Sequence, residues 1–543
     1  MNNKLYWKMF ERRSLISFII TLFLMFVCIL RIAVISNTDY TQIINSQNRM
    51  KIKITDLRGS IFDCNLVPLT NQKEKIIAAV YPTPRAITAI STVLKGDEKI
   101  DVLNKLKSGK PTICEVPTVI YNEGIDCEEI IFNDTQENKA NHIIGYTDAD
   151  NRGVSGLQKA YDDILYSEEA VYAYFETDGK GNVLKGTEPE IKYNSSVAAS
   201  GVVSTIDINI QNIIENEAEN LKKGAIIVAE SKTNKIKGIL SRPDYENSKI
   251  EEALKSNDSP LLNKAILNYN VGSVFKPCVA IAGIESQKED FWYNCTGKVK
   301  IIDRFYKCHE LEGHGIINLE TAIAKSCNTY FYNYSLKIGG EKIYNTSKNL
   351  QFGNSLKLCD GIETAKGRIP SKESLENPAN LANFSIGQGE LLASPVSLLT
   401  LYSAIATDGK YNIPSVVEGI LQNGKIEEYN IGNQIKVMSS KTAEKLRKCL
   451  EKVFLNGTAK DIKPTYTTVA GKTATAQTGK WKNGVEICEG WFCGFFPAEK
   501  PVYTVIVFCE DTSIQEKSSA EIFVSIADKV SELKNLNTTS QKE

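Results

Sequence analysis

Histidine is scarce in this chain, with three residues among 543. A catalytic Ser-His-Asp triad is therefore hard to assemble. The chain also lacks an excess of charge of either sign, because 64 Lys and Arg side chains balance 65 Asp and Glu, and this composition gives no indication of nucleic-acid binding. No internal repeat is visible, and apolar residues make up 42% of the chain, which is enough for a large core.

Three short motifs carry the chemistry, and they follow one another as Ser273-Val274-Phe275-Lys276, Ser326-Cys327-Asn328 and Lys472-Thr473-Ala474-Thr475. A serine with a lysine three positions later is what acyl transfer requires when histidine is not available. At the start of a helix such positions share a face, with Cβ atoms about 5–6 Å apart. Lys276 is therefore predicted to take the proton of Ser273, provided that burial and neighbouring cations lower the lysine pKa.

The ordered motifs resemble those of the penicillin-binding proteins, the serine D,D-transpeptidases that crosslink peptidoglycan. The resemblance is to class B members, which have no glycosyltransferase domain. Within class B it is to the division or sporulation type, as found in clostridia. It extends over most of residues 40–535. Longer segments carry it: Asn270–Pro277, Ala324–Phe331, Phe384–Gly389 with Ser394-Pro395, and Val469–Thr473.

The resemblance implies a role for each residue of the first two motifs. Ser273 attacks the carbonyl between the last two D-alanines of a stem peptide, and Lys276 takes the serine proton. Ser326 relays that proton to the leaving amine, and Asn328 hydrogen-bonds the amide of the peptide. No cofactor is implied for this catalysis, and penicillins are expected to acylate the same serine.

The third motif is expected to bind the peptide terminus. Lys472 and Thr473 hold the terminal carboxylate, and the backbone N–H groups of Ser273 and Thr475 form the oxyanion hole. The substrate site is further expected to include Gly387, Gln388, Gly389 and Ala474. Ala474 departs from the family, which normally has glycine there so that an extended ligand lies close to the strand. Activity is expected to survive this methyl group with weaker β-lactam acylation.

The N-terminus predicts a membrane anchor. Residues from Ser14 to Leu30 are apolar or small without a charge, and Ile32 to Ile35 extend the run, which is about enough to span a bilayer. Basic residues precede it and predict a cytoplasmic N-terminus: Lys4, Lys8, Arg12 and Arg13. A cleaved signal peptide is the alternative, but its apolar core is usually about 7–15 residues long and no clear cleavage site follows here.

The predicted fold is α+β, a penicillin-binding transpeptidase fold whose antiparallel sheet is flanked by helices. Local patterns predict hairpins over Gly224–Ile239 and around Pro497–Pro501, a strand over Thr467–Thr478, and helices over Ser273–Glu285 and Ala520–Leu533. Leu57–Asp63 resembles the segment that opens the class B pedestal. The predicted parts are a cytoplasmic tail (1–13), a transmembrane anchor (14–36), a pedestal or dimerisation domain (37–203), a transpeptidase domain (204–534) and a disordered tail (535–543).

Cysteine is unusually frequent for an exported chain, with 13 residues, but the count is odd and the spacing shows no disulfide framework. Most are predicted to be buried free thiols. The spacing of Cys295, Cys308 and His314 is typical of a loop that supplies three ligands to a structural zinc ion. The fourth ligand is expected among Asp290, Asp303, His309 and Glu310. A Cys295–Cys308 disulfide, or two free thiols beside a structural histidine, are the alternatives.

Two other functions fit parts of the sequence. A β-lactamase or penicillin sensor shares Ser273, Lys276 and Asn328, although no deacylating carboxylate is evident. A non-catalytic scaffold of a division or spore-wall complex would explain Ala474 as a sign of a decayed site. The resemblance also implies a partner, a membrane-embedded SEDS-type glycan polymerase, because class B proteins do not polymerise glycan themselves.

Overall fold

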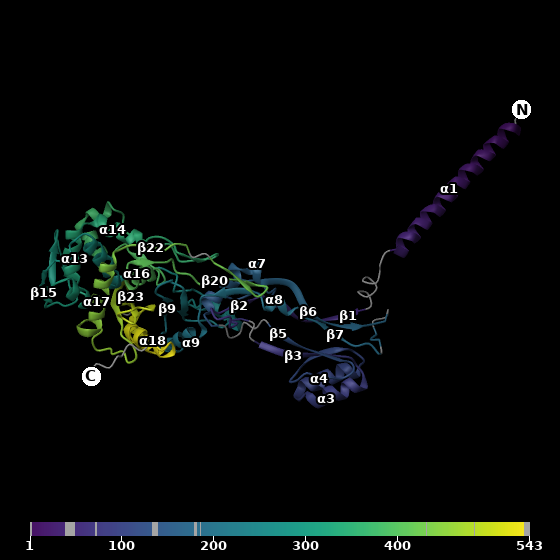
Figure 1. Ribbon diagram of the computed structural model, residues 1–543, viewed down its shortest axis with the longest axis horizontal. Coiled ribbons are helices and arrows are strands. Elements are labelled where there is room, and N and C mark those ends of the chain that lie inside the picture. Colours follow the sequence, from purple (N-terminus) through teal and green to yellow (C-terminus); the bar gives the residue numbers. More distant parts are fainter. Residues whose placement is uncertain are drawn as a thin grey trace. The chain divides into compact units, whose positions relative to one another are not determined.

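The structure is a computed structural model that describes residues 3–37, 49–70, 73–132, 139–178, 182–184, 186–429, 432–482 and 484–536 (Figure 1). The chain forms two compact units. The first comprises Met1–Thr55, Lys75–Ile130 and Ala170–Tyr193, and the second comprises Asp56–Glu74, Ile131–Glu169 and Asn194–Glu543. Both units mix helices and strands, so the α+β prediction is confirmed. The second unit includes segments before residue 203, and the domain boundaries expected from the sequence stay predictions.

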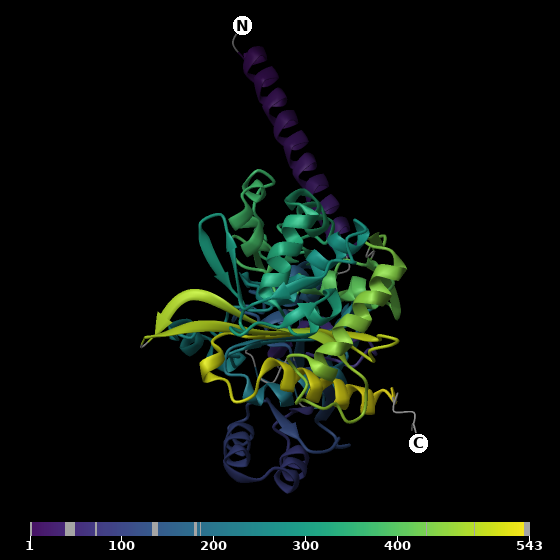
Figure 2. The same ribbon diagram turned by 90° about the vertical axis from the view of Figure 1, so that its left-hand side faces the viewer.

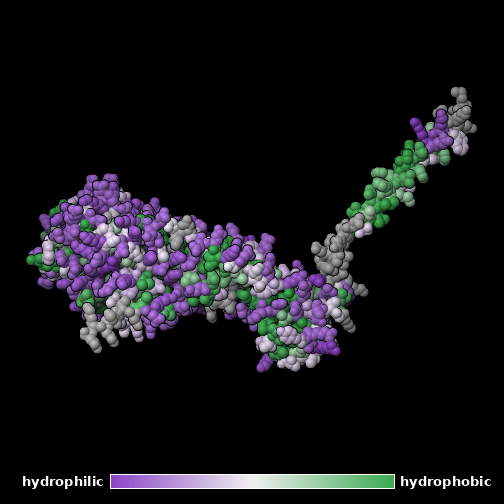
Figure 3. All heavy atoms as spheres, viewed as in Figure 1, coloured by the Kyte–Doolittle hydropathy of each residue, from purple (hydrophilic) through white to green (hydrophobic). Residues whose placement is uncertain are grey.

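Helix α1 (Asn3–Asn37) contains the apolar N-terminal segment. Its 31 residues from Tyr6 to Ser36 are apolar enough to cross a membrane, and none of them is buried. At about 1.5 Å per residue they extend over about 46 Å, more than the roughly 30 Å of a hydrocarbon core. Figure 3 shows most of this helix as hydrophobic, with hydrophilic residues gathered toward its N-terminal end.

The first unit also contains most of two three-stranded sheets, in the orders β1-β6-β7 and β4-β3-β5. Their strands are β1 (Arg49–Arg58), β6 (Tyr166–Glu176), β7 (Glu190–Lys192), β4 (Thr112–Val116), β3 (Lys73–Val80) and β5 (Ile125–Phe132). Helices α3 (Pro84–Val93) and α4 (Gly96–Lys107) cover the second sheet, where Ile90 and Leu106 pack against Val80. Thr83 caps α3 by accepting a hydrogen bond from the Ala86 N–H.

The second unit is built on a five-stranded antiparallel sheet in the order β10-β9-β25-β24-β23. Its strands are β9 (Gly224–Glu230), β10 (Ile236–Arg242), β23 (Ala470–Lys482), β24 (Val485–Phe496) and β25 (Tyr503–Cys509). The two predicted hairpins are therefore confirmed. The central strands are apolar on both faces, as in Ala225–Ala229, because helices cover both sides of the sheet (Figure 2).

One face of this sheet packs against α18 (Ser519–Leu533) and α9 (Ile208–Glu217). Phe492 of β24 meets Phe523 of α18 with ring centroids 4.3 Å apart, and a capping box of Ser518 and Glu521 fixes the start of α18. The predicted closing helix is confirmed. Residues 537–543 of the tail predicted as disordered lie outside the described residues.

The other face carries a larger group of helices, drawn above the sheet in Figure 2. They are α11 (Lys276–Glu285), α12 (Leu319–Ala324), α13 (Asn328–Ile338), α14 (Gly340–Asn349), α15 (Pro378–Ser385) and α16 (Leu398–Ala406). Helix α17 (Ser440–Asn456) packs along the edge strand β23, and its Phe454 meets Phe492 and Phe523 on the first face. Every residue of α11 from Lys276 to Ile284 is buried, which is the pattern of a helix at the centre of a core.

Shorter elements complete the second unit. The short helices are α5 (Asn141–Ile144), α6 (Gly156–Ala160), α7 (Asp162–Leu165), α8 (Ser195–Ala198) and α10 (Ile250–Lys255). A four-stranded sheet contains β2 (Ser60–Phe62), β8 (Gly201–Ser204), β20 (Val417–Gln422) and β21 (Lys425–Glu428). Two-stranded pairs are β11 (Tyr269–Asn270) with β18 (Leu392–Ala393), β12 (Tyr293–Cys295) with β15 (Gly315–Ile317), β13 (Lys298–Ile301) with β14 (Arg304–Lys307), β16 (Lys357–Cys359) with β17 (Ile362–Glu363), and β19 (Lys410–Tyr411) with β22 (Ile435–Lys436).

A buried arginine anchors the segment that resembles the pedestal opening. Arg58 is 2% exposed, and it donates to Gln158 Oε1 at 2.7 Å and pairs with an Asp162 oxygen at 2.9 Å. Burial lowers the pKa of Arg58, and the Asp162 carboxylate opposes this shift. A buried cation of this kind depends on its partners, since they replace the water that it has lost.

Replacing Arg58 with alanine is expected to lower the free energy of unfolding of the second unit by roughly 3–5 kcal/mol, because a buried pair and its hydrogen bonds are lost. Arg368→Ala is the control, since its pair with Glu390 at 3.2 Å is exposed and its loss should change stability little. Denaturant unfolding of the full chain in detergent measures both. Equal losses for the two variants would contradict the buried role.

Candidate active site

Ser273 lies in a 3₁₀ turn, Gly272–Phe275, and not in the first turn of an α-helix as expected. The reason is Pro277, which has no N–H to donate to the Ser273 carbonyl as an α-helix would require. The Lys276 N–H makes that bond instead and closes the tighter turn. Helix α11 then begins at Lys276, where proline is tolerated in the first turn.

Lys276 is fully buried, and its amine is held by the second motif. The Nζ donates to Ser326 O at 2.7 Å, to Asn328 Oδ1 at 2.8 Å and to Ser326 Oγ at 3.1 Å. Burial lowers the lysine pKa to about 7, against the opposing effect of two nearby thiols. Neutral and charged forms are therefore both present near neutral pH. Within the described residues, Lys276 Nζ makes no hydrogen bond to Ser273. The proton transfer expected between these two side chains therefore stays a prediction.

Ser326 connects α12 to α13 with a left-handed backbone, at φ 56°. This conformation is unfavourable for a residue with a Cβ, and such residues concentrate at functional sites. Here it turns both the carbonyl and the hydroxyl of one residue toward the same Lys276 amine. The turn is also held by the Cys327 N–H, which donates to Ala322 O at 3.0 Å.

The third motif lies on β23, the edge strand of the sheet. Lys472 is fully buried, and burial together with the nearby Lys276 charge keeps its pKa well below the usual value. Thr473 shares a hydrogen bond with Thr458, with 2.6 Å between the hydroxyl oxygens. Ala474 faces the Gly272–Phe275 turn, which is called the nucleophile turn because it carries the expected nucleophile Ser273. A Cβ placed on Gly272 would lie 3.4 Å from the Ala474 methyl carbon. For Lys276, the main cause of the lowered pKa is burial and not the neighbouring Lys472.

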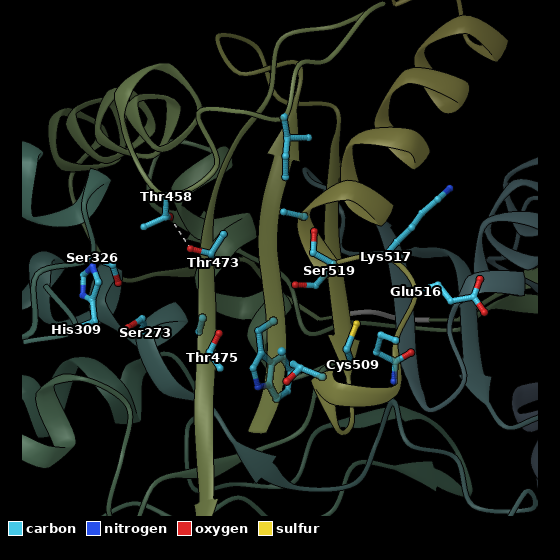
Figure 4. A pocket seen from close by; sticks show the side chains of 18 of the residues that line it. Ser273, His309, Ser326, Thr458, Thr473, Thr475, Cys509, Glu516, Lys517 and Ser519 are labelled. Atoms are coloured by element: carbon cyan, nitrogen blue, oxygen red, sulfur yellow. Dashed lines mark hydrogen bonds between the residues drawn. The ribbon is translucent and has the colours of Figure 1, made fainter. Parts of the chain in front are cut away.

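A cleft of about 640 Å³ brings the three motifs together. Figure 4 shows Ser273 and Ser326 beside the strand that carries Thr473 and Thr475. The lining also includes Asn328, Ala474, His309 and Thr458, with residues Gln515–Ala520 at its other end. The two lysines lie beneath this lining. Thr458 was not predicted, because nothing in the sequence after α17 indicates that this hydroxyl meets Thr473.

The predicted substrate residues Gly387, Gln388 and Gly389 do not line this cleft. Gly387 instead accepts a hydrogen bond from the Gly272 N–H at 2.8 Å, and a Cβ on Gly387 would lie 1.9 Å from Gly272 O. Glycine is required there by the close approach of the two chains behind the nucleophile. A contact of these residues with substrate stays a prediction.

The three predicted metal ligands do lie together. Cys295, Cys308 and His314 form a cluster with Cys327, and the four candidate ligand atoms lie within 4.8 Å of one another. The fourth member of this cluster is Cys327, and none of the residues expected as the fourth ligand, Asp290, Asp303, His309 and Glu310, belongs to it. Cys327 was overlooked because it is the middle residue of the second motif, between Ser326 and Asn328. His309 faces the cleft, although its Nδ1 is 3.8 Å from Cys308 Sγ.

The spacing in this cluster agrees with tetrahedral coordination. Zinc bonds of about 2.3 Å to sulfur and 2.0–2.1 Å to nitrogen require sulfur pairs about 3.8 Å apart and sulfur–nitrogen pairs about 3.6 Å apart. The Cys308 and Cys327 sulfurs are 3.8 Å apart, and His314 Nδ1 is 3.6 Å from each of Cys295 and Cys308 Sγ. The hydrogen bond between these two thiols lowers the pKa of Cys308 and raises the pKa of Cys327.

The thirteen cysteines are all free thiols, and nine of them are buried. The prediction that most are buried free thiols is therefore confirmed. No Cys295–Cys308 disulfide is formed.

Comparison with known proteins agrees with this geometry. A family described as the penicillin binding protein transpeptidase domain matches residues 224–528. Stage V sporulation protein D of Bacillus subtilis is 27% identical over 388 residues, which cover 67% of this chain and 58% of that protein. The peptidoglycan D,D-transpeptidase MrdA of Acinetobacter baumannii is 26% identical over 394 residues, covering 66% of this chain and 57% of that protein. These alignments thus span less than two thirds of each relative.

A solved structure shows the same fold at lower identity. Penicillin binding protein 3 from Mycobacterium tuberculosis, complexed with aztreonam, has a TM-score of 0.64 at 20% identity, with 90% of this chain and 98% of that chain covered. The matched family accounts for more than half of the 543 residues and contains all three motifs. With its serine and edge strand lining one cleft and the lysine of the first motif buried beside them, the chain belongs to the penicillin-binding proteins, through their transpeptidase domain.

Proposed function

We propose that this chain is a class B serine D,D-transpeptidase that crosslinks peptidoglycan stem peptides and is acylated by β-lactams. The buried amine of Lys276 carries the proposal, because it lies beneath the cleft with a pKa of about 7 and bonds to the second motif. A neutral amine at this pKa is suited to general base catalysis near neutral pH. The names of the MrdA relative and the aztreonam complex support the substrate and the inhibitor class.

In the first half-reaction, neutral Lys276 takes the proton of Ser273 while the Ser273 oxygen attacks the penultimate D-alanine carbonyl. The N–H groups of Ser273 and Thr475 stabilise the oxyanion, and losing one such donor typically costs about 10²–10³ in rate. The carbon–nitrogen bond then breaks, the lysine proton passes through the Ser326 hydroxyl to the leaving amine, and D-alanine departs. An amine of a neighbouring stem takes the acyl group from Ser273 by the reverse proton path, which forms the crosslink.

The carboxylate of the substrate brings a negative charge to Lys472. Lys472 is buried beside Lys276, and two such amines do not both hold a proton without a counter-ion. A bound carboxylate restores the Lys472 proton and accepts from the Thr473 hydroxyl, which is held by Thr458. Binding of the correct terminus thus keeps the positive charge on Lys472 and leaves Lys276 neutral for catalysis.

The chain is proposed to be a single-pass membrane protein with a cytoplasmic N-terminus. Four basic residues precede the apolar part of α1, and the positive-inside rule keeps them in the cytoplasm. The catalytic domain then lies outside the membrane, where peptidoglycan is found. The pedestal expected over residues 37–203 is proposed to dock partners, among them a SEDS-type glycan polymerase.

We also propose that the cluster of Cys295, Cys308, His314 and Cys327 holds a structural zinc ion. The observed sulfur–sulfur and sulfur–nitrogen distances support this proposal. A bound zinc ion would cross-link the loops of residues 295–314 to the turn of the second motif. The residues on either side of Cys327 are Ser326 and Asn328, so the same link would fix the two groups that hold Lys276.

The first test is acylation of the full chain by a fluorescent penicillin. The adduct is expected on Ser273, located by mass spectrometry, and Ser273→Ala should abolish it. A long-lived adduct supports the transpeptidase, whereas rapid release of hydrolysed drug indicates a β-lactamase. Complementation by Ser273→Ala in cells would instead indicate a scaffold.

The acylation rate is expected to rise with pH through about 7, because the neutral form of Lys276 is the base and its pKa is lowered to about 7. Lys276→Met should lower the rate by about 10²–10⁴-fold, as expected for loss of a general base. Stopped-flow acylation from pH 5.5 to 8.5 measures both. A rate that is flat over this range would exclude Lys276 as the base.

Ala474→Gly is expected to increase the rate of acylation by a labelled penicillin, because the methyl group lines the cleft beside the nucleophile turn. Ala476→Gly is the matched control, since Ala476 also faces Gly272 but does not line the cleft. If Ala474→Gly leaves the acylation rates unchanged, the methyl group does not restrict the ligand.

The zinc proposal predicts one zinc ion per chain by metal analysis of the purified protein. Cys295→Ser should lower this content and the midpoint of thermal unfolding, because the ion links loops that otherwise separate. Cys449→Ser, a buried thiol of α17 outside the cluster, is the control and should keep the metal. Finding no zinc before or after reconstitution would end the proposal.

A further inference from the structure

The nucleophile turn rests on four side chains of the sheet. Ala474 and Ala476 on β23 lie opposite Trp491 and Glu489 on β24. Directly opposed residues of an antiparallel pair share a face, so all four point toward the turn. Gly272 fits over the two alanines, since a Cβ there would lie 3.1 Å from that of Ala476.

The residue three positions before Ser273 is clamped by the other two members of this set. The Asn270 N–H donates to Glu489 Oε2 at 3.0 Å, and the Trp491 indole N–H donates to Asn270 O at 2.9 Å. Both main-chain polar groups of one residue are thus held by side chains of β24. Between this clamp and Ser273 lie only Val271, which is buried, and Gly272.

Glu489 is an unusual choice for this position. It is 7% exposed, and no salt bridge to it is found in the described residues. Burial raises its pKa to about 7, and the Asn270 N–H opposes that shift. The charge of Glu510 raises the pKa further, although Glu510 is itself paired with Lys264 at 2.7 Å.

The remaining groups around Glu489 do not balance the negative charge of its carboxylate. Lys480 of β23 favours the ionised form, but only as a weaker influence than burial and Glu510. Tyr269, next to Asn270, has its own pKa raised by burial and by the two glutamates. Cys488 on the same strand has a raised pKa and stays a neutral thiol. The proton on Glu489 therefore depends mainly on pH and on the hydrogen bond to Asn270.

We propose that Glu489 is a positioning residue for the nucleophile: its carboxylate holds Asn270 against the sheet and thereby fixes the placement of Ser273 above Lys276. The inference rests on the proposed acyl transfer at Ser273. A charged acceptor makes a stronger bond to an N–H than a neutral carboxyl group does, so protonation of Glu489 loosens the clamp. Fast acylation then requires two deprotonated groups, the Lys276 amine and the Glu489 carboxyl.

The test compares three variants of the full chain in acylation by a fluorescent penicillin. Glu489→Ala removes the acceptor and should lower the rate at pH 8 by roughly 10- to 100-fold, as for a lost hydrogen bond to a charged group. Glu489→Gln keeps an oxygen acceptor that does not titrate. Because this acceptor is neutral, like that of the protonated carboxyl group, the rate at pH 8 should lie between those of Glu489→Ala and the wild type.

The pH profile separates positioning from a purely structural role. Just below pH 7 the wild-type rate should fall more steeply than that of Glu489→Gln, which should fall by about one log unit per pH unit. Glu486→Gln is the matched control on the same strand, because its carboxylate bonds to Gln477 and the Gly479 N–H and not to Asn270. It should keep the wild-type profile.

A Glu489→Ala variant that acylates like the wild type would overturn the proposal, as would a Glu489→Gln profile as steep as that of the wild type. If Glu489→Ala does not fold, judged by thermal unfolding, the Glu489→Gln profile alone decides. Absence of acylation in the wild type would instead overturn the proposed function, so the two failures are distinguishable.

Discussion

The proposed active site depends on one interaction, the bonding of the buried Lys276 amine to a single turn of the second motif. Removing this amine from water costs far more than a surface charge would, and the three oxygens of Ser326 and Asn328 recover part of that cost. The consequence is a lysine that exchanges its proton near neutral pH. In the proposed mechanism, a chain with few histidines thereby obtains a base of histidine-like strength from a residue that is normally always charged.

The surrounding structure supports Lys276 and the turn of the second motif from three sides. Helix α11 is buried from Lys276 to Ile284 and keeps the lysine out of solvent. The left-handed backbone at Ser326 presents two oxygens to one amine. The edge strand closes the third side with Lys472 and Thr473, and the missing Cβ of Gly272 lets the nucleophile turn approach Ala474 and Ala476 of this strand. Each support is a close approach that leaves little room for a larger side chain.

The sequence was sufficient for the parts that depend on local pattern. Both hairpins of the sheet, the closing helix and the three motifs follow from apolar runs, turns and spacing, and they lie where they were expected. The 3₁₀ turn at Ser273 could have been anticipated from Pro277, since a missing N–H forces it. Cys327, Thr458 and Glu489 could not, because their roles arise from contacts between segments far apart in the chain.

The position of β23 at the border of its sheet also bears on how inhibitors are recognised. One side of this strand pairs with β24, while the other faces the cleft with main-chain groups that no described strand occupies. A compound that hydrogen-bonds to those groups depends on the main chain, which an amino-acid substitution does not remove. Escape from such a drug by mutation is then restricted to the few positions where a new atom blocks its approach, and Ala474 is one of them.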